Sequence, residues 1–378
     1  MGEPLTIIRN GTVVTQHAVK QADIWIQQGK IVRTHPDTLL KKWSGGQALL
    51  EIDASNFYIL PGFLQVLKAN SLCYRPTQSY VQQIRLLIEQ GITTFIDTIQ
   101  IGNWMDESQC MYQLSPHYNS PIDYAVRIEI TAGECHQDRL RQLIKQGFRL
   151  IQIMVYTPEE VHRINWNRLY PLLLQERVSL HLHILGETIS REDRQNIIEA
   201  WLQYCHYGKI RTCVNENQTK EVIKEAISFY HLQPVGKLEE KQKEQGWLVS
   251  QLKNWYLHHS LFASIQELTI PSQLWVRGEA ERILSLMVRL ASTNVAKLAG
   301  CYPVKGSLLP GADADLLFLK KDKWLTNHPI STMLILSEIC NPVSVMSKGT
   351  FIYQNGTHHS TIGAGKHLRS LRPYNYAM

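Results

Sequence analysis

The strongest constraint on the fold is a change of apolar spacing along the chain. Between about residues 76 and 300, stretches with helical spacing alternate with short apolar runs typical of strands. The first pair is a helix-like stretch over 80–88, followed by Gly91 and a strand-like run over 92–97. The spacing of about 3.6 residues indicates a helix that buries one face, and short β-branched runs indicate strands. Repeated strand and helix units predict a parallel sheet or barrel in the middle of the chain.

The same spacing predicts the remaining elements. Further strands are expected at 124–130, 150–155, 178–184 and 210–214, with a weaker one at 261–265. Helices are expected near 137–146, 190–204, 218–230 and 277–299. Both ends of the chain differ from this middle, because residues 5–60 and the part beyond 305 contain short strands joined by glycine and asparagine turns.

Two β-rich ends around one βα middle predict two domains. An isolated hairpin is barely stable alone, so strands from the C-terminal part are expected to pair with those of the N-terminal part. This gives a composite β-sandwich from residues 1–60 and 305–360, a barrel from 61–304, and a tail from 361–378. The bend from sandwich to barrel is expected at Pro61 and Gly62.

Composition excludes several classes of protein. The 378 residues are 44% hydrophobic and 19% charged, which is typical of a folded globular chain. The net charge of +6 comes from scattered residues, so neither a nucleic-acid-binding arm nor a membrane-binding arm is indicated. Seven cysteines without a Cys-x-x-Cys pair predict reduced, buried thiols. No leader or long apolar run is visible, so a cytoplasmic protein is expected.

One long segment carries a family resemblance. Residues 291–316 contain Asn294, Lys305-Gly306, Pro310-Gly311 and then Asp-Ala-Asp-Leu, and residues 348–356 and 363–369 carry further glycine-rich matches. The chain resembles the dihydroorotase, dihydropyrimidinase and allantoinase branch of the cyclic amidohydrolases. This resemblance implies a (β/α)8 TIM-like barrel with a small β-sandwich built from both ends of the chain. It implies a fold rather than an activity.

The first barrel strand departs from the pattern of that branch. The family places Pro-Gly-Phe-Ile-Asp before His-x-His, and this chain has Pro61-Gly62-Phe63 followed by other residues. Gln65 stands in the aspartate position, and Leu67 and Ala69 stand in the two histidine positions. Neither leucine nor alanine can bind a catalytic zinc.

Three more positions that the resemblance marks as ligand positions also differ. Gln152 stands where the family often has a lysine that becomes carboxylated, and an amide cannot form that carbamate. Asn215 lies at the end of strand six, near the place of a ligand histidine, and Ile265 lies near the place of the catalytic aspartate. The resemblance therefore implies the frame of an enzyme without most of its metal ligands.

The expected fifth barrel strand, at 178–184, has histidines where the resemblance implies a ligand histidine. His181 and His183 share one strand face, because side chains repeat every two residues along a strand. One interpretation makes them interior residues that are hydrogen-bonded to neighbours. The other makes them ligands of one metal ion, completed by a carboxylate from Glu187, Asp97 or Glu216.

Other polar features have simpler interpretations. Asp313 and Asp315 are expected to make turn and strand-start hydrogen bonds, and His358 with His359 is expected in an exposed loop. Cys205 is expected to be a buried thiol rather than a nucleophile. The basic and aromatic residues of the tail suit either an arm that crosses a neighbouring subunit or a disordered end.

Two functions follow as hypotheses. The first is a homologue without metal or hydrolysis that acts as a binding, scaffold or assembly subunit, either in a homo-oligomer or with an active amidohydrolase or a carbamoyltransferase. The second is a hydrolase of cyclic amides or other C–N bonds with one rebuilt zinc site on His181 and His183. The two hypotheses differ in whether the protein holds zinc in stoichiometric amount.

Overall fold

A computed structural model describes most of the chain. The described residues are 4–35, 49–69, 72, 77–100, 112–186, 189–214, 269–271, 279–325, 333–335, 341–359 and 362–368. Of the expected elements, the helix at 218–230 and the strand at 261–265 lie outside them.

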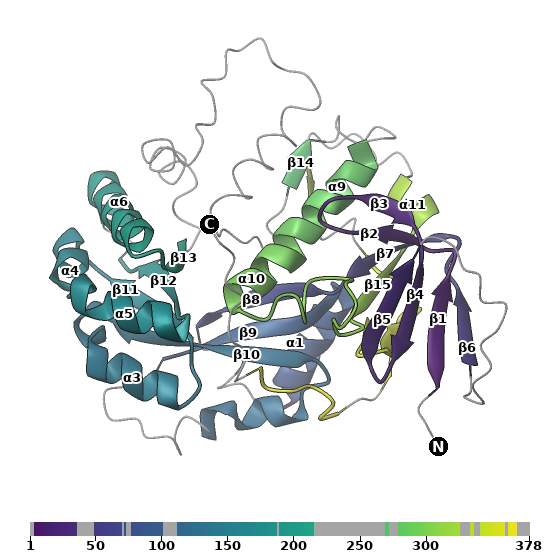
Figure 1. Ribbon diagram of the computed structural model, residues 1–378, viewed down its shortest axis with the longest axis horizontal. Coiled ribbons are helices and arrows are strands. Elements are labelled where there is room, and N and C mark those ends of the chain that lie inside the picture. Colours follow the sequence, from purple (N-terminus) through teal and green to yellow (C-terminus); the bar gives the residue numbers. More distant parts are fainter. Residues whose placement is uncertain are drawn as a thin grey trace, which may run out of the picture.

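The centre of the molecule is a six-stranded parallel sheet (Figure 1). Its strands are β8 (Phe63–Ala69), β9 (Ile92–Gln100), β10 (Asp123–Thr131), β11 (Leu150–Val155), β12 (Ser179–Ile184) and β13 (Arg211–Val214). They lie in chain order from β8 to β13, as consecutive βα units require. Within the described residues the sheet is open, so the α/β class is confirmed, whereas the closed eight-stranded barrel stays a prediction.

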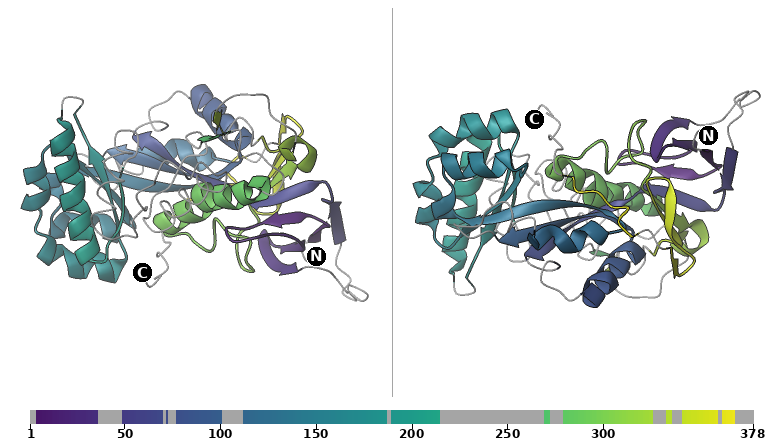
Figure 2. Two further views of the ribbon diagram at one scale, coloured as in Figure 1. Left: turned by 90° about the horizontal axis from the view of Figure 1, so that it is seen from above. Right: turned by 90° about the horizontal axis from the view of Figure 1, so that it is seen from below.

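Helices cover the outer face of this sheet. They are α1 (Thr77–Glu89), α3 (Gln137–Lys145), α4 (Pro158–Arg163), α5 (Trp166–Glu176) and α6 (Arg191–Tyr207). The helix α9 (Glu279–Val288), the π-helical turn η5 (Arg289–Thr293) and α10 (Asn294–Ala299) lie on the opposite side (Figure 2). The α6 helix begins where the Ser190 side chain accepts a hydrogen bond from the Asp193 amide.

The spacing analysis assigned no element to 158–176, where the structure has α4 and α5. Two prolines obscure this region, because Pro158 begins α4 and Pro171 lies inside α5. Proline is favourable in the first turn of a helix but removes a backbone donor in its interior. The interior Pro171 is tolerated here because α5 also has a side-chain cap at Asn165 and buries Trp166.

Two antiparallel-rich sheets form the β-sandwich. One has the order β5-β4-β1-β6 and the other β19-β18-β17-β15-β7-β2-β3. The N-terminal strands are β1 (Leu5–Arg9), β2 (Thr12–Val14), β3 (Val19–Gln21), β4 (Asp23–Gln27), β5 (Lys30–His35), β6 (Leu49–Asp53) and β7 (Phe57–Pro61). The C-terminal strands are β15 (Leu316–Lys320), β17 (Ser344–Ser347), β18 (Thr350–Gln354) and β19 (Thr357–His358).

The expected pairing between the two ends of the chain is present. Strand β7 pairs antiparallel with β15, with Leu60 opposite Leu317. Residues from both ends also share one hydrophobic cluster, in which Ile8 and Ile24 pack with Leu316 and Met346. The exact domain boundaries stay a prediction. Short elements outside these sheets are β14 (Thr269–Pro271) with β16 (Met333–Ile335), and α11 (Lys321–Leu325).

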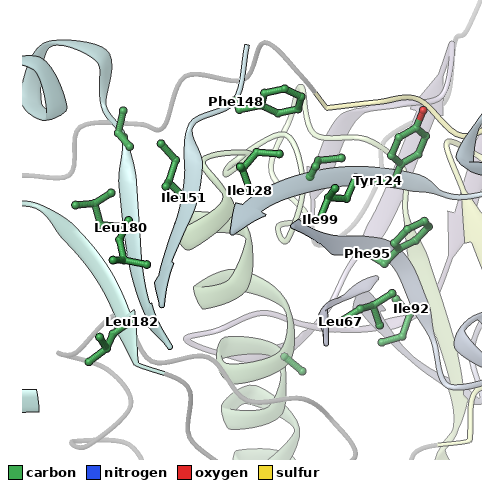
Figure 3. Packing of buried hydrophobic residues seen from close by; sticks show 14 of the residues in the cluster. Leu67, Ile92, Phe95, Ile99, Tyr124, Ile128, Phe148, Ile151, Leu180 and Leu182 are labelled. Atoms are coloured by element: carbon green, nitrogen blue, oxygen red, sulfur yellow. The ribbon is translucent and has the colours of Figure 1, made fainter. Parts of the chain in front are cut away.

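Two hydrophobic clusters lie on the two faces of the parallel sheet. The larger one packs strand residues such as Phe95, Ile151 and Leu180 against the outer helices (Figure 3). The smaller one packs Leu64 and other strand residues against Val295 of α10. Among the described residues, no helix combines the length and the apolar character needed to span a membrane.

Candidate functional site

Polar side chains line the inner face of the sheet on three neighbouring strands. In the register of the sheet, Glu129 of β10 lies beside Gln152 of β11, and Gln152 lies beside His181 of β12. Arg127 and His183 lie two residues away on the same face of their strands. The sheet therefore gathers a cation, an anion, an amide and two imidazoles in one layer.

Glu129 is the acceptor at the centre of this layer. Its carboxylate, which is fully buried, accepts from Gln152 Nε2 at 2.5 Å and from His183 Nδ1 at 2.6 Å, both at Oε1. Gln100 Nε2 donates to its Oε2 at 2.8 Å. Burial raises the pKa of Glu129, but the hydrogen bonds from His183, Gln100 and Gln152 outweigh burial, and the net pKa lies below the ordinary value. Glu129 is therefore a carboxylate at neutral pH.

This contact fixes the orientation of His183. Because ionised Glu129 can only accept, the Nδ1 of His183 carries the hydrogen and donates it. The side chain of His183 is 24% exposed, whereas the Glu129 carboxylate that orients it is fully buried. In neutral His183 the Nε2 atom is then a hydrogen-bond acceptor.

His181 has both ring nitrogens engaged. Arg127 Nη1 lies 3.1 Å from Nδ1, and Ser179 Oγ lies 3.2 Å from Nε2. A guanidinium can only donate, so Nδ1 accepts and Nε2 carries the hydrogen that it donates to Ser179. Burial, followed by the charge of Arg127, lowers the pKa of His181 well below its ordinary value. His181 is therefore a neutral, hydrogen-bonded interior residue.

Arg127 continues this network to the first strand. Its Nε and Nη2 atoms donate to Thr98 Oγ1 at 3.0 and 2.9 Å. Thr98 in turn donates to the backbone carbonyl of Leu67 at 3.1 Å. A charged guanidinium thus lies in the layer where the sequence resemblance places metal ions.

Leu67 packs on the helical side of the sheet. It is buried, but it belongs to the cluster that contains Phe95 and the α1 residue Tyr80, not to the inner cluster with Leu64 (Figure 3). Leu64 and Val66 belong to the inner cluster, so the alternation of side chains along β8 puts Leu67 on the opposite face. The place of Leu67 in a relict pocket stays a prediction. Ala69 lies at the end of β8, and its side chain is outside the described residues.

The other expected residues are only partly placed. Gln65 and Gln152 are buried, and the Oε1 atom of each has no hydrogen-bond partner. Asn215, Ile265, Glu187 and Glu216 lie outside the described residues.

Asp97 is engaged away from the two strand-five histidines. Its carboxylate lies 3.1 Å from His117 Nε2, and His117 Nδ1 lies 3.1 Å from Tyr80 Oη, all in the buried interior. These partners come from the helical side of the sheet. Asp97 therefore does not complete a metal site with His181 or His183.

The donor set fits a catalytic zinc poorly. Catalytic zinc sites use three protein ligands and one position for water. Among the described residues, no three histidine, cysteine, aspartate or glutamate side chains gather in a way that could hold a metal ion. Both nitrogens of His181 are in hydrogen bonds, and the nearby Arg127 charge repels a dication.

The sequence analysis missed Arg127, Glu129 and Gln100. Arg127 and Glu129 alternate with Val126, Ile128 and other apolar residues along β10. A charged residue at every second position of an apolar strand indicates one polar face, and that signal was present in the sequence.

Three other expectations need correction. His358 lies in β19 and its Nε2 is 2.8 Å from Glu89 Oε1, so it is a half-buried contact to α1 and not an exposed loop residue. Asp313 and Asp315 both contact the buried Lys305, at 2.8 and 2.7 Å, so they form ion pairs beyond the expected turn bonds. The described part of the tail, 362–368, pairs with its own β10.

The fold has known counterparts. The parallel sheet with outer helices and a sandwich from both ends is similar in fold to solved dihydropyrimidinases and hydantoinases. The chain is similar to the dihydropyrimidinase of Brevibacillus agri, with a TM-score of 0.66 and 17% identity over 99% of this chain and 100% of that structure. It is also similar to the L-hydantoinase of Arthrobacter aurescens, with a TM-score of 0.66 and 17% identity over 97% and 99% of the two chains. The resemblance seen in the sequence is confirmed at the level of fold.

Sequence comparison gives shorter matches. The human dihydropyrimidinase-related protein 5 is 30% identical over 105 residues, which are 25% of this chain and 19% of the relative. The rat dihydropyrimidinase is 26% identical over 107 residues, which are 26% of this chain and 21% of the relative. The matches thus span about a fifth of the length of these curated relatives. No protein-family model matches the chain.

Proposed function

We propose that this chain is a non-catalytic relative of the hydantoinase-type amidohydrolases that works by binding, as a scaffold or assembly subunit. The observation that carries the proposal is the contact between Arg127 Nη1 and His181 Nδ1 at 3.1 Å. It places a permanent cation against one of the two nitrogens through which His181 could bind a metal, while the other nitrogen donates to Ser179. The charge of the guanidinium does not depend on pH in the physiological range.

The rest of the layer supports the same proposal. Gln152 donates its amide to Glu129, and His183 donates its Nδ1 hydrogen to the same oxygen. These hydrogen bonds hold Glu129, Gln152 and His183 together without an ion between them, although the Oε1 atom of Gln152 has no hydrogen-bond partner. We propose Gln152, His181 and His183 as the described part of a relict pocket, with Gln65, Ala69, Asn215 and Ile265 as its further candidates.

The proposal extends to architecture and assembly. It includes a closed eight-stranded barrel at 61–304 and a sandwich from 1–60 with 305–360. It also includes a cytoplasmic protein in a homo-oligomer, or in an assembly with an active amidohydrolase or a carbamoyltransferase. Size-exclusion chromatography with light scattering tests the oligomer, and pull-down with these two classes of enzyme tests the partner.

One observation favours a second function. A carboxylate that fixes the imidazole of His183 is also how proteins orient a histidine for metal binding. The alternative is therefore a hydrolase of C–N bonds in cyclic amides, with one zinc on a rebuilt site that includes His183.

Elemental analysis separates the two functions. The protein is produced with zinc in the medium, and the metal content of the wild type is compared with His183→Ala and with His206→Ala, a control on an exposed α6 residue. We expect only substoichiometric zinc in all three, and no hydrolysis of hydantoin or dihydrouracil above background. About one zinc per chain, lost in His183→Ala and kept in His206→Ala, would establish the metal-dependent alternative.

A further inference from the structure

Residues 362–368 form a strap across the beginning of β10. The Tyr124 amide donates to the Lys366 carbonyl at 3.1 Å, and the Leu368 amide donates to the Tyr124 carbonyl at 2.8 Å. His367 forms a parallel bridge with Tyr124. One edge of β10 pairs with β9 from Asp123 onward. The strap therefore lies along the other edge of β10, which pairs with β11 only from Arg127 onward. The strap thus takes the place of a missing strand segment.

Side chains add specific contacts to this backbone pairing. Asp123 Oδ1 accepts from the Lys366 amide at 2.6 Å and from Lys348 Nζ at 2.5 Å. Lys348 Nζ also donates to the Ala364 carbonyl at 3.2 Å. The imidazole of His367 stacks on the ring of Tyr124, with centroids 5.1 Å apart and planes 6° apart.

The two sides of this contact differ in burial. On the receiving side, Asp123 and Tyr124 are 1% and 2% exposed. On the strap, no residue is fully buried, and Ile362 is 75% exposed. The strap therefore covers a deeply buried surface while it buries little of itself. Segments held mainly by accessible hydrogen bonds open with less free energy than the core beneath them.

We propose that the strap is detachable and that the surface beneath it, formed by Ser120, Ile122, Asp123, Tyr124 and Lys348, is a binding site for an extended peptide. The strap occupies this site in the same chain. An incoming peptide adds to the open side of β10 by the backbone bonds that the strap makes, which is recognition by strand addition. This goes beyond the proposed function, because it places a protein-binding surface away from the relict pocket.

The strap also specifies the chemistry of the partner. The position of Gly365 requires glycine, because a Cβ atom there would meet the Ile122 carbonyl oxygen at 2.1 Å. The next residue supplies an amide hydrogen to Asp123, and the following one supplies a flat ring that stacks on Tyr124. The fourth supplies an apolar side chain, since Leu368 packs against the inner hydrophobic cluster. The partner is an extended segment of the form Gly-x-aromatic-apolar.

Hydrogen exchange of the full wild-type chain tests whether the strap opens. We expect the amides of Tyr124 and Leu368 to exchange at least about tenfold faster than the amide of Ile128, farther along β10, because they open locally. Equal rates for all three amides would mean that the strap opens only when the whole protein unfolds, and would overturn the proposal. In Gly365→Ala we expect faster exchange at both Tyr124 and Leu368 with the rate of Ile128 unchanged, whereas Ile362→Ala, which changes an exposed strap residue, leaves all three rates unchanged.

Peptide binding tests the surface itself. The probe is a fluorescent peptide, Ile-Gly-Ala-Gly-Lys-His-Leu, which has the sequence of residues 362–368. Fluorescence anisotropy is expected to show binding to the folded Gly365→Ala chain, in which the strap is displaced, and at least about tenfold weaker binding to the wild type, where the strap competes. A peptide with alanine at the second glycine is expected not to bind. Absence of binding to a folded Gly365→Ala chain, or equal binding of both peptides, would overturn the proposal.

Discussion

Lys305 is a buried charged residue outside the parallel sheet. Its ammonium group is almost fully buried and lies 2.5 Å from Asp123, 2.8 Å from Asp313 and 2.7 Å from Asp315. Burial lowers the pKa of Lys305, but the charges of the three carboxylates outweigh burial and raise it. The lysine therefore stays charged at neutral pH. The substitution Lys305→Met keeps an unbranched side chain of similar size, without the terminal ammonium group, and so removes its charge.

The expected loss of stability depends on which partners each carboxylate keeps after Lys305→Met. Asp313 keeps Lys30 at 2.5 Å, and Asp123 keeps Lys348 at 2.5 Å. Asp315 loses its only ion pair among the described residues and keeps an amide donor, the backbone of Lys348 at 2.9 Å. Removing one partner of a buried ion pair costs about 3–5 kcal/mol, since the other charge stays buried. We expect a loss of free energy of unfolding in this range.

Urea unfolding at pH 7 measures this loss. The control is Lys320→Met, which removes an exposed lysine at the end of β15 and is expected to change stability by less than about 0.5 kcal/mol. The double variant Lys305→Met with Asp315→Asn removes the uncompensated charge and is expected to recover part of the loss. A loss below about 1 kcal/mol in Lys305→Met, or no recovery in the double variant, would refute the argument from buried charge.

Three further outcomes can be measured. The pKa of Glu129 is lowered in the folded protein. Its contribution to the free energy of unfolding is therefore present above the ordinary pKa near 4.5 and is lost as pH falls through the pKa of the folded state. The variant Glu129→Gln should flatten the pH dependence of urea unfolding below about pH 5. Burial raises the pKa of three thiols to about 12, so a thiol reagent at pH 8 should modify them only after unfolding, and rapid modification of any of these three in the native chain, located by peptide mass mapping, would contradict their burial. These thiols are Cys135, Cys205 and Cys301. A Cβ atom at Gly62 would lie 2.0 Å from Thr93 Oγ1, so Gly62→Ala should cost about 1–3 kcal/mol in urea unfolding, and the added Thr93→Ala should restore part of it.

Much of the fold was predictable because local spacing encodes it. The strand predicted at 150–155 matches β11, and the helix predicted at 137–146 matches α3 within one residue. The α3 helix buries one face at helical spacing, whereas β11 is a short, mainly apolar run that is buried on nearly both faces. Where proline interrupts the spacing, as in α5, the prediction failed, because packing of Trp166 decides what propensity alone does not.

The candidate site was less predictable because it depends on register. The pairing of His183 with Glu129 joins residues that lie 54 positions apart. Their contact follows from the order and alignment of β10, β11 and β12, which no local pattern states. The register of β8 against β9 also shifts between Val66 and Ala69, and a shift of one residue changes which side chains share a face.

The pairing of β7 with β15 has a consequence for how the chain is made. Residue 60 finds its partner at residue 317, so the N-terminal strands leave the ribosome long before the strand that completes their sheet. Contacts between such distant parts of a chain form slowly, and unpaired strand edges are prone to aggregation in the meantime. The protein is therefore expected to depend on chaperones during synthesis more than a chain of the same size with local strand pairing.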